Sequence, residues 1–152
     1  MIAIAAVCEN GGIGRGGALL YPIRADLRRF RQLTMGKTLV MGRRTLESLP
    51  GGRGLPGRRN LVLSQDPAFH PEDAELLRSL DQVPADAVVI GGESVYRQLL
   101  PRCDRLYITR IFAAPEADAF FPTLGPEWGV EQSSEILTED NLRFQYVDYV
   151  RV

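Results

Sequence analysis

Apolar residues along the chain gather in short runs, and polar segments with helical spacing lie between the runs. A short run that is apolar nearly throughout, with turn residues on both sides, is typical of a strand buried on both faces of a sheet. On this basis strands are expected at Ile2–Cys8, Thr38–Met41, Asn60–Leu63, Ala87–Ile90 and Arg105–Thr109.

Helical spacing is clearest between the first two of these runs. Leu27, Phe30 and Leu33 recur every three residues in the segment Ala25–Leu33, and Asp26 lies in its opening turn. Two further helices, each directly after a strand that ends in glycine, are expected over Arg43–Leu49 and Ser94–Leu100.

The C-terminal third reads as two strands, Gly129–Ile136 and Arg143–Val152, joined around the turn-rich segment Thr138–Asn141. Strands that alternate with helices and end in a hairpin predict an α/β fold: a mostly parallel central sheet flanked by helices, with an antiparallel C-terminal hairpin at its edge. The segment Gly11–Gly17 holds five glycines in seven residues and is expected to be an irregular loop.

The length of 152 residues is that of one ordinary domain, so a single domain over residues 1–152 is expected. No apolar run approaches the roughly 18 residues of a membrane span. The opening segment Met1–Val7 also lacks the basic flank of a signal peptide. We therefore expect a cytoplasmic protein without a membrane partner, and a monomer, because no segment indicates an obligate interface.

Cysteine and histidine are scarce, which removes several classes of enzyme. Cys8 and Cys103 are too far apart in sequence for a CxxC motif and too few for a disulfide framework. They and the single histidine, His70, cannot form a common zinc site, so no metal is expected. No GxSxG motif accompanies the histidine, which argues against most nucleophilic hydrolases.

Charge is distributed unevenly along the chain. Residues 1–65 hold eleven of the 18 basic residues and three of the 19 acidic ones, so the remainder is strongly acidic. A basic half favours nucleic acid or an anionic small molecule as partner, unless its arginines are simply solvated. No stacking aromatics are interleaved with the basic residues, so nucleic acid is not expected and a phosphate-bearing small molecule is favoured.

Glycines at two strand ends provide candidate phosphate sites. Gly42-Arg43-Arg44-Thr45 opens a helix, whose free N–H groups and two guanidinium groups suit a phosphate. Gly91-Gly92 offers the same backbone geometry without side-chain charge. The alternatives are that both arginines are solvated and that the glycine pair serves only a tight turn.

Asp26 is the sharpest single candidate for chemistry. It lies beside Leu27, one turn before Phe30, on what the spacing predicts to be the buried side of its helix. A carboxylate there needs hydrogen-bond partners, and only Arg29 among the adjacent arginines shares its face. It is either a carboxylate reserved for a ligand's donors or an ordinary first-turn acid.

Several segments, in order and over most of the chain, resemble the bacterial dihydrofolate reductases. Val40–Leu49 is similar to the family's MGRxTxES segment, and Leu55–Asn60 to its LPGRxN segment. The opening strand with Ile13-Gly14, Asp26-Leu27 with Phe30, Val89–Gly92 with Tyr96, and Leu106–Thr109 resemble other family blocks.

This resemblance implies NADPH-dependent reduction of 7,8-dihydrofolate to tetrahydrofolate, with antifolates as further small-molecule ligands. By the resemblance, the catalytic residues are Asp26, which binds the pterin and favours protonation at N5, with Thr109 and Tyr21 beside it. The substrate-binding residues it implies are Ile4, Ala6, Asp26, Leu27, Phe30, Leu49, Arg58, Ile90 and Thr109. The cofactor-binding residues it implies are Ala6, Ile13, Gly14, Leu19, Gly42, Arg43, Arg44, Thr45, Leu63, Ser64, Gln65, Ile90, Gly91, Gly92, Glu93, Ser94, Val95 and Tyr96, with a cis Gly91–Gly92 bond.

One position departs from the family pattern, because Leu20-Tyr21 stands where a proline-tryptophan pair is usual. Turnover and antifolate sensitivity are therefore expected to differ from those of typical members. Two alternatives remain open. A riboflavin-pathway pyrimidine reductase of the same fold would need neither Asp26 with Phe30 nor Arg58, and a non-catalytic folate- or nucleotide-binding protein would keep the pocket without turnover.

Overall fold

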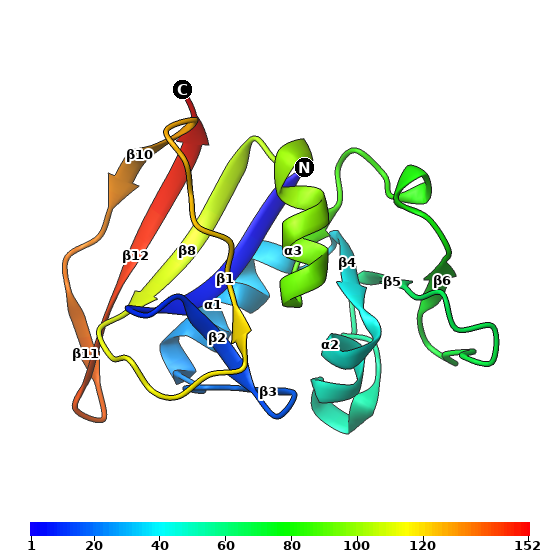
Figure 1. Cartoon of the computed structure of the whole chain (residues 1–152). Coiled ribbons are helices and arrows are strands. Elements are labelled where there is room, and N and C mark those ends of the chain that lie inside the picture. The colour runs from blue at the N-terminus through cyan, green and yellow to red at the C-terminus, as the bar shows by residue number, and fades with distance from the viewer.

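The computed structural model describes residues 1–152 and is built around one large twisted sheet (Figure 1). The strands of this sheet follow the spatial order β10-β12-β8-β1-β7-β4-β5-β6, and β11 pairs with β12. Neighbours from β8 to β6 are parallel, whereas β12 runs antiparallel to β8, β10 and β11. The parallel strands are β1 (Ile2–Cys8), β4 (Thr38–Gly42), β5 (Arg59–Leu63), β6 (Glu75–Leu77), β7 (Val88–Val89) and β8 (Arg105–Ile111).

Helices cover both faces of this sheet. Successive residues of a strand point to opposite sides, so strands that are apolar throughout present an apolar surface on both faces. On one face Val95, Tyr96 and Leu99 of α3 (Glu93–Leu99) pack with Ala3 and Val40. The opposite face carries α1 (Arg24–Thr34) and α2 (Arg43–Ser48), which pack with Ile4, Leu39, Met41 and Val62. Short 3-10 turns occupy Pro50–Gly52, Leu80–Gln82 and Leu100–Arg102. None of the helices is both long and apolar enough to cross a membrane.

The expected fold class is confirmed, including the antiparallel C-terminal strands. Strand β12 (Leu142–Arg151) is as long as expected and lies one residue earlier, and it pairs at its two ends with β10 (Trp128–Ser133) and β11 (Leu137–Glu139). The turn between β11 and β12 is narrower than the sequence indicates: Asp140 and Asn141 adopt positive φ values of 50° and 66°. Thr138 and Glu139, expected in the turn, belong to β11.

The expectation of an irregular loop at Gly11–Gly17 was wrong. This segment contributes β2 (Gly12–Arg15), which pairs with β3 (Ala18–Leu19) and β9 (Ala119–Phe120) in a separate three-stranded antiparallel sheet. The glycines are used at defined points: Gly16 and Gly17 form the β2–β3 turn with φ values of 61° and 82°. Pairing with β9, about a hundred residues away, organises a segment whose local composition alone predicts no regular structure.

Candidate functional site

A cavity of about 680 Å³ opens at the carboxyl ends of the central parallel strands. Ligands collect at this edge in open α/β sheets because loops and helix N-termini converge there. Three segments from the sequence analysis line it: the Gly42–Thr45 and Gly91–Tyr96 turns, and the glycine-rich strand β2 with β3. The cavity is lined by every residue expected at a cofactor site: Ala6, Ile13, Gly14, Leu19, Gly42, Arg43, Arg44, Thr45, Leu63, Ser64, Gln65, Ile90, Gly91, Gly92, Glu93, Ser94, Val95 and Tyr96.

The cavity also includes residues that sequence reasoning missed. Arg78 follows β6, and Asp118 precedes β9, so both depend on strands too short to give a periodic signal. Arg97 lies on α3 and could have been found from its place three residues after Ser94. Other lining residues that were not predicted are Ala5, Arg15, Gly17, Ala18, Ser48, Ser79, Leu80, Gln98 and Ala119.

Backbone conformation explains the glycine at position 91 of the Gly91-Gly92 turn. The peptide bond between them is cis, as expected, and Gly91 has a φ of 124°. A Cβ on Gly91 would lie 3.4 Å from both Thr45 Oγ1 and the Tyr96 ring. The amide of Gly42 donates to the Gly91 carbonyl at 2.8 Å, which joins the two glycine turns in one cradle. A side chain at Gly91 would therefore lie against Thr45 and Tyr96 in a backbone conformation that L residues rarely adopt.

Tyr96 fixes the floor of this cradle. Its buried hydroxyl donates a 2.6 Å hydrogen bond to the Ile4 carbonyl, and burial raises the pKa of the phenol well above its usual value. Ile4 is one of the residues that the resemblance places at the substrate. In the structure its carbonyl accepts from Tyr96, which leaves one of the two lone pairs for another donor.

Asp26 does not line the cavity itself and is connected to it through Thr109 of the neighbouring strand. It projects from α1 and accepts a hydrogen bond from the Thr109 hydroxyl of β8. Thr109 pairs in register with Ala6 of β1, which lines the cavity. Burial raises the pKa of the Asp26 carboxyl, while the Thr109 hydrogen bond and the charge of Arg29 oppose that rise. Asp26 and Thr109 are thus brought together as expected.

Arg29 does not pair with Asp26, although both occupy one helix face. Its guanidinium forms an ion pair of 3.2 Å with Asp148 of β12 and stacks 4.1 Å from the centre of the Tyr146 ring. Asp148 is far away in sequence, so no local pattern could have indicated this partner. The carboxylate of Asp26 keeps an oxygen without a protein hydrogen-bond partner.

Most of the expected apolar substrate residues gather beside Asp26. Ile4 belongs to the core cluster on the α1 and α2 face, and Phe30, Leu49 and Ile90 pack against it. Ile90 also lines the cavity, so the apolar wall and the cavity are continuous. Leu27 differs, because it is 45% exposed.

Arg58 is held in place by neutral partners only. Its Nε donates to the Pro56 carbonyl at 2.9 Å and its Nη1 to the Thr34 hydroxyl at 3.1 Å. Partial burial and the nearby Arg31 lower the pKa of the Arg58 guanidinium. An oriented guanidinium without a carboxylate partner can bind an anionic group through its remaining N–H donors.

Tyr21 lies in the segment between β3 and α1 and packs against the cluster of Cys8, Ile23, Ile111 and Phe144. Its hydroxyl makes no hydrogen bond within the protein. Ala6, which lines the cavity, packs against the same cluster, whereas Tyr21 does not line the cavity. A catalytic contribution of Tyr21 stays a prediction.

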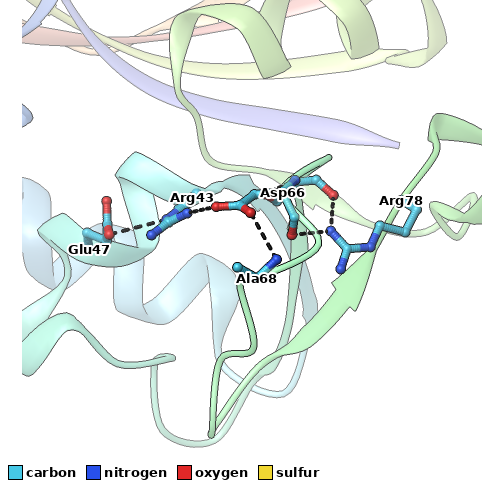
Figure 2. Close-up of polar contacts among 6 residues, drawn as sticks. Arg43, Glu47, Asp66, Ala68 and Arg78 are labelled. Carbon is cyan, nitrogen blue, oxygen red and sulfur yellow. Dashed lines mark hydrogen bonds and ion pairs between the residues drawn. The ribbon is translucent and has the colours of Figure 1, made fainter.

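The two arginines after Gly42, Arg43 and Arg44, differ in whether they form ion pairs. Arg43 forms ion pairs with Asp66 at 2.7 Å and Glu47 at 3.4 Å, so it is not simply solvated (Figure 2). Arg44 lines the cavity and forms no ion pair. Of these two arginines, Arg43 is therefore neutralised and Arg44 is available to an anionic ligand.

Comparison with known proteins agrees with this geometry. The family model described as dihydrofolate reductase matches residues 1–151. A type 3 dihydrofolate reductase of Salmonella typhimurium is 46% identical over 125 residues, which cover 78% of this chain and 76% of that protein. The dihydrofolate reductase of Mycobacterium tuberculosis (strain H37Rv) is 38% identical over 152 residues, covering 96% of this chain and 94% of that protein.

A solved structure extends the similarity to the whole fold. The dihydrofolate reductase of Enterococcus faecalis, complexed with NADP(H) and RAB-propyl, superposes with a TM-score of 0.90 at 34% sequence identity. The match covers 99% of this chain and 95% of that one. With a family model matched over nearly its full length, this chain belongs to the dihydrofolate reductase family.

Proposed function

We propose that this protein reduces 7,8-dihydrofolate to 5,6,7,8-tetrahydrofolate with NADPH. The observation that carries the proposal is the hydrogen-bonded pair of Asp26 and Thr109, which lies beside a cavity shaped for a dinucleotide. Family membership and the NADP(H) complex of the Enterococcus faecalis relative support it. We propose further that the protein acts as a cytoplasmic monomer.

The residues of the cavity fit NADPH. The joined glycine turns at Gly42 and Gly91 expose backbone to the cavity at the starts of α2 and α3, where amides have no partner inside the helix. Arg44, Ser64 and Arg78 supply hydrogen-bond donors for phosphate at one end, and Ala6 and Ile13 line the other. When bound, NADPH supplies the hydride, so the protein itself must bind, orient and place a proton.

In this proposal Asp26 accepts hydrogen bonds from the exocyclic amino group and N3 of the pterin ring. Thr109 fixes the orientation of the carboxyl from its other side. The surrounding apolar wall raises the pKa of Asp26 and makes it a better proton source than a solvated carboxylate. The carboxyl thereby favours the N5-protonated substrate, to which hydride transfer at C6 is easier.

Two further parts of the site complete the binding mode. The pterin and the ring next to it pack against Phe30, Leu49 and Ile90. The α-carboxylate of the glutamate tail binds to Arg58. The Pro56 carbonyl and the Thr34 hydroxyl hold the Arg58 guanidinium before the substrate arrives. Such prior orientation reduces the entropy lost on binding.

The alternatives are less favoured. A pyrimidine reductase of the riboflavin pathway has no use for an oriented Arg58 or for Asp26 facing an apolar wall. The similar proteins of Salmonella typhimurium and Mycobacterium tuberculosis carry the name dihydrofolate reductase. A non-catalytic binding protein would have no reason to retain a buried carboxyl whose burial opposes its ionised form.

The test follows NADPH absorbance with the purified protein and dihydrofolate, for the wild type and for Asp26→Asn. Asparagine keeps the shape and the contact with Thr109 but cannot deliver a proton. We expect dihydrofolate-dependent oxidation by the wild type and a loss of about 100-fold or more in kcat in the variant. Wild-type protein that binds NADPH but ignores dihydrofolate would exclude the proposed substrate.

A further inference from the structure

We propose that Asp66 is a specificity-determining residue that weakens the preference of this protein for NADPH over NADH. It does so by neutralising Arg43, the arginine that opens α2 at the phosphate corner of the cavity. The inference rests on the proposed function, because it assumes that the adenosine 2′-phosphate, the only group that distinguishes the two cofactors, binds near Arg43.

The geometry of Arg43 carries the argument. Figure 2 shows its side chain between two carboxylates: Nη1 donates to Asp66 Oδ2 at 2.7 Å, and Nε lies 3.4 Å from Glu47 Oε2. The guanidinium also stacks 4.5 Å from the centre of the Phe69 ring. A guanidinium binds a phosphate best through two parallel N–H donors, and Asp66 occupies one of them.

The loop that carries Asp66 is itself well defined. The second carboxylate oxygen of Asp66 accepts from the Ala68 amide at 2.9 Å, and its own amide donates to the Ser64 hydroxyl at 3.2 Å. Arg78 donates to the carbonyls of both Ser64 and Asp66, as Figure 2 shows for the Asp66 contact. Because the neighbouring residues Ser64 and Gln65 line the cavity, the carboxylate lies next to the anion site.

Two effects follow for a ligand with a 2′-phosphate. The phosphate competes with the Asp66 carboxylate for the same N–H donors of Arg43, and the two anions repel each other at close range. Arg44 and Arg78 still provide positive charge at this corner, so the phosphate site persists but is weaker. NADH lacks the phosphate, so neither the competition for Arg43 nor the repulsion by Asp66 affects its binding.

Asp66→Asn separates the charge from the structure. Asparagine can still accept from the Ala68 amide, so the loop keeps its turn, while the negative charge is lost. Asp66 and Arg43 are each a little over 40% exposed, so the effect is that of a solvated pair. We expect the Kd of NADPH to fall about three- to fivefold, with the Kd of NADH changed by less than about twofold.

The experiment measures the Kd of NADPH and NADH by isothermal titration calorimetry on the full chain, with thermal unfolding as a check that each variant is folded. Asp66→Glu retains the charge and is expected to keep the wild-type ratio of the two Kd values. Glu131→Gln removes a carboxylate from a comparable surface pair with Arg105 and is expected to leave both Kd values unchanged. The gain in Asp66→Asn is expected to shrink at 1 M salt, because the term is electrostatic.

The possible outcomes distinguish a failure of the inference about Asp66 from a failure of the proposed function. If Arg43→Ala reduces the preference for NADPH but Asp66→Asn leaves it unchanged or lowers it, the inference is overturned and the proposed function stands. An equal gain in Glu131→Gln overturns it as well, since the effect is then one of net charge. If the wild type binds neither cofactor, the proposed function fails together with the inference.

Discussion

Asp26 is a single residue whose position lowers the stability of the folded protein. Burial beside the apolar wall of α1 disfavours its ionised form, while the Thr109 hydroxyl and the charge of Arg29 only partly compensate. Arg29 is committed to Asp148 and does not neutralise Asp26 directly. A carboxyl retained in such surroundings is best explained by what it does for a ligand.

The raised pKa of Asp26 predicts a pH-dependent effect on stability. The folded state binds this proton more tightly than the unfolded chain, so ionised Asp26 costs stability as pH rises above about 4. Asp26→Asn removes that cost. We expect the variant to be about 1 kcal/mol more stable at pH 7, which raises Tm by roughly 2–4 °C, with a smaller advantage at pH 5.

Thermal unfolding of both proteins at the two pH values checks this prediction. Thr109→Val serves as a comparison. It removes the hydrogen-bond donor that opposes the rise in the pKa of Asp26 and leaves the buried carboxyl in place. It is expected to destabilise the protein at pH 7. An Asp26→Asn variant that is less stable than the wild type at both pH values would contradict the argument.

At the scale of elements, the small sheet β3-β2-β9 forms one side of the cavity. Asp118, just before β9, accepts from the Gly16 amide at 2.9 Å and donates its own amide to the Gly14 carbonyl at 3.0 Å. Glu93 at the start of α3 accepts from the Phe120 amide at 2.7 Å, which joins β9 to the glycine turn. The glycine-rich strand is thus ordered by side chains distant in sequence.

Asp118→Ala is expected to loosen this sheet without unfolding the protein. The variant loses the acceptor for Gly16, at an exposed turn where two glycines with positive φ provide little order of their own. We expect faster proteolytic cleavage at Gly16-Gly17 and a Kd for NADPH weakened by about three- to tenfold. Limited proteolysis and calorimetry measure the two effects.

Glu116→Gln provides the control for Asp118→Ala. It removes only the exposed ion pair between Glu116 and Arg15, of 3.3 Å, in the same region. Exposed pairs contribute little, so cleavage and cofactor affinity should remain close to those of the wild type. Equal effects of the two substitutions would show that the Gly16 contact has no special role.

For the whole molecule, folding largely cancels the charge asymmetry of the sequence. Arginines of the basic N-terminal half find acidic partners in the other half, as in the pairs Arg29–Asp148 and Arg59–Glu75. Those that form no ion pair include Arg44, at the cavity, and Arg58, beside the apolar wall. Arg44 and Arg58 therefore keep their positive charge where the proposed ligands bind, while the exposed Arg28, Arg31 and Lys37 also lack ion pairs.

Binding of cofactor should stabilise the whole fold, because residues of β1, β4, β5 and the small sheet line the cavity together. At about 100 times its Kd, NADPH is expected to add about 2.7 kcal/mol, or roughly 5–10 °C in Tm. NADH at the same concentration should give a smaller rise. Thermal unfolding measures both, and equal shifts would argue against recognition of the 2′-phosphate in this cavity.

Buried strands were predictable because their residues are apolar on both faces, a pattern that few other structures produce. The strands β3, β6 and β9, with two or three residues each, were missed because such strands are defined by their partners. The prediction of an irregular loop at Gly11–Gly17 was wrong for the same reason, since the order of this segment comes from β9 and Asp118.

The sequence by itself determined the residue types and spacing of the site: the glycine turns, Asp26, Arg58 and the pair Arg43-Arg44. These follow from local chemistry and from a resemblance carried by contiguous motifs. Only the tertiary structure decided which charges are used and which remain, such as Arg43 with Asp66 and Arg29 with Asp148. Ion pairs form between groups that folding brings within a few ångströms, and a linear pattern of charges does not contain those distances.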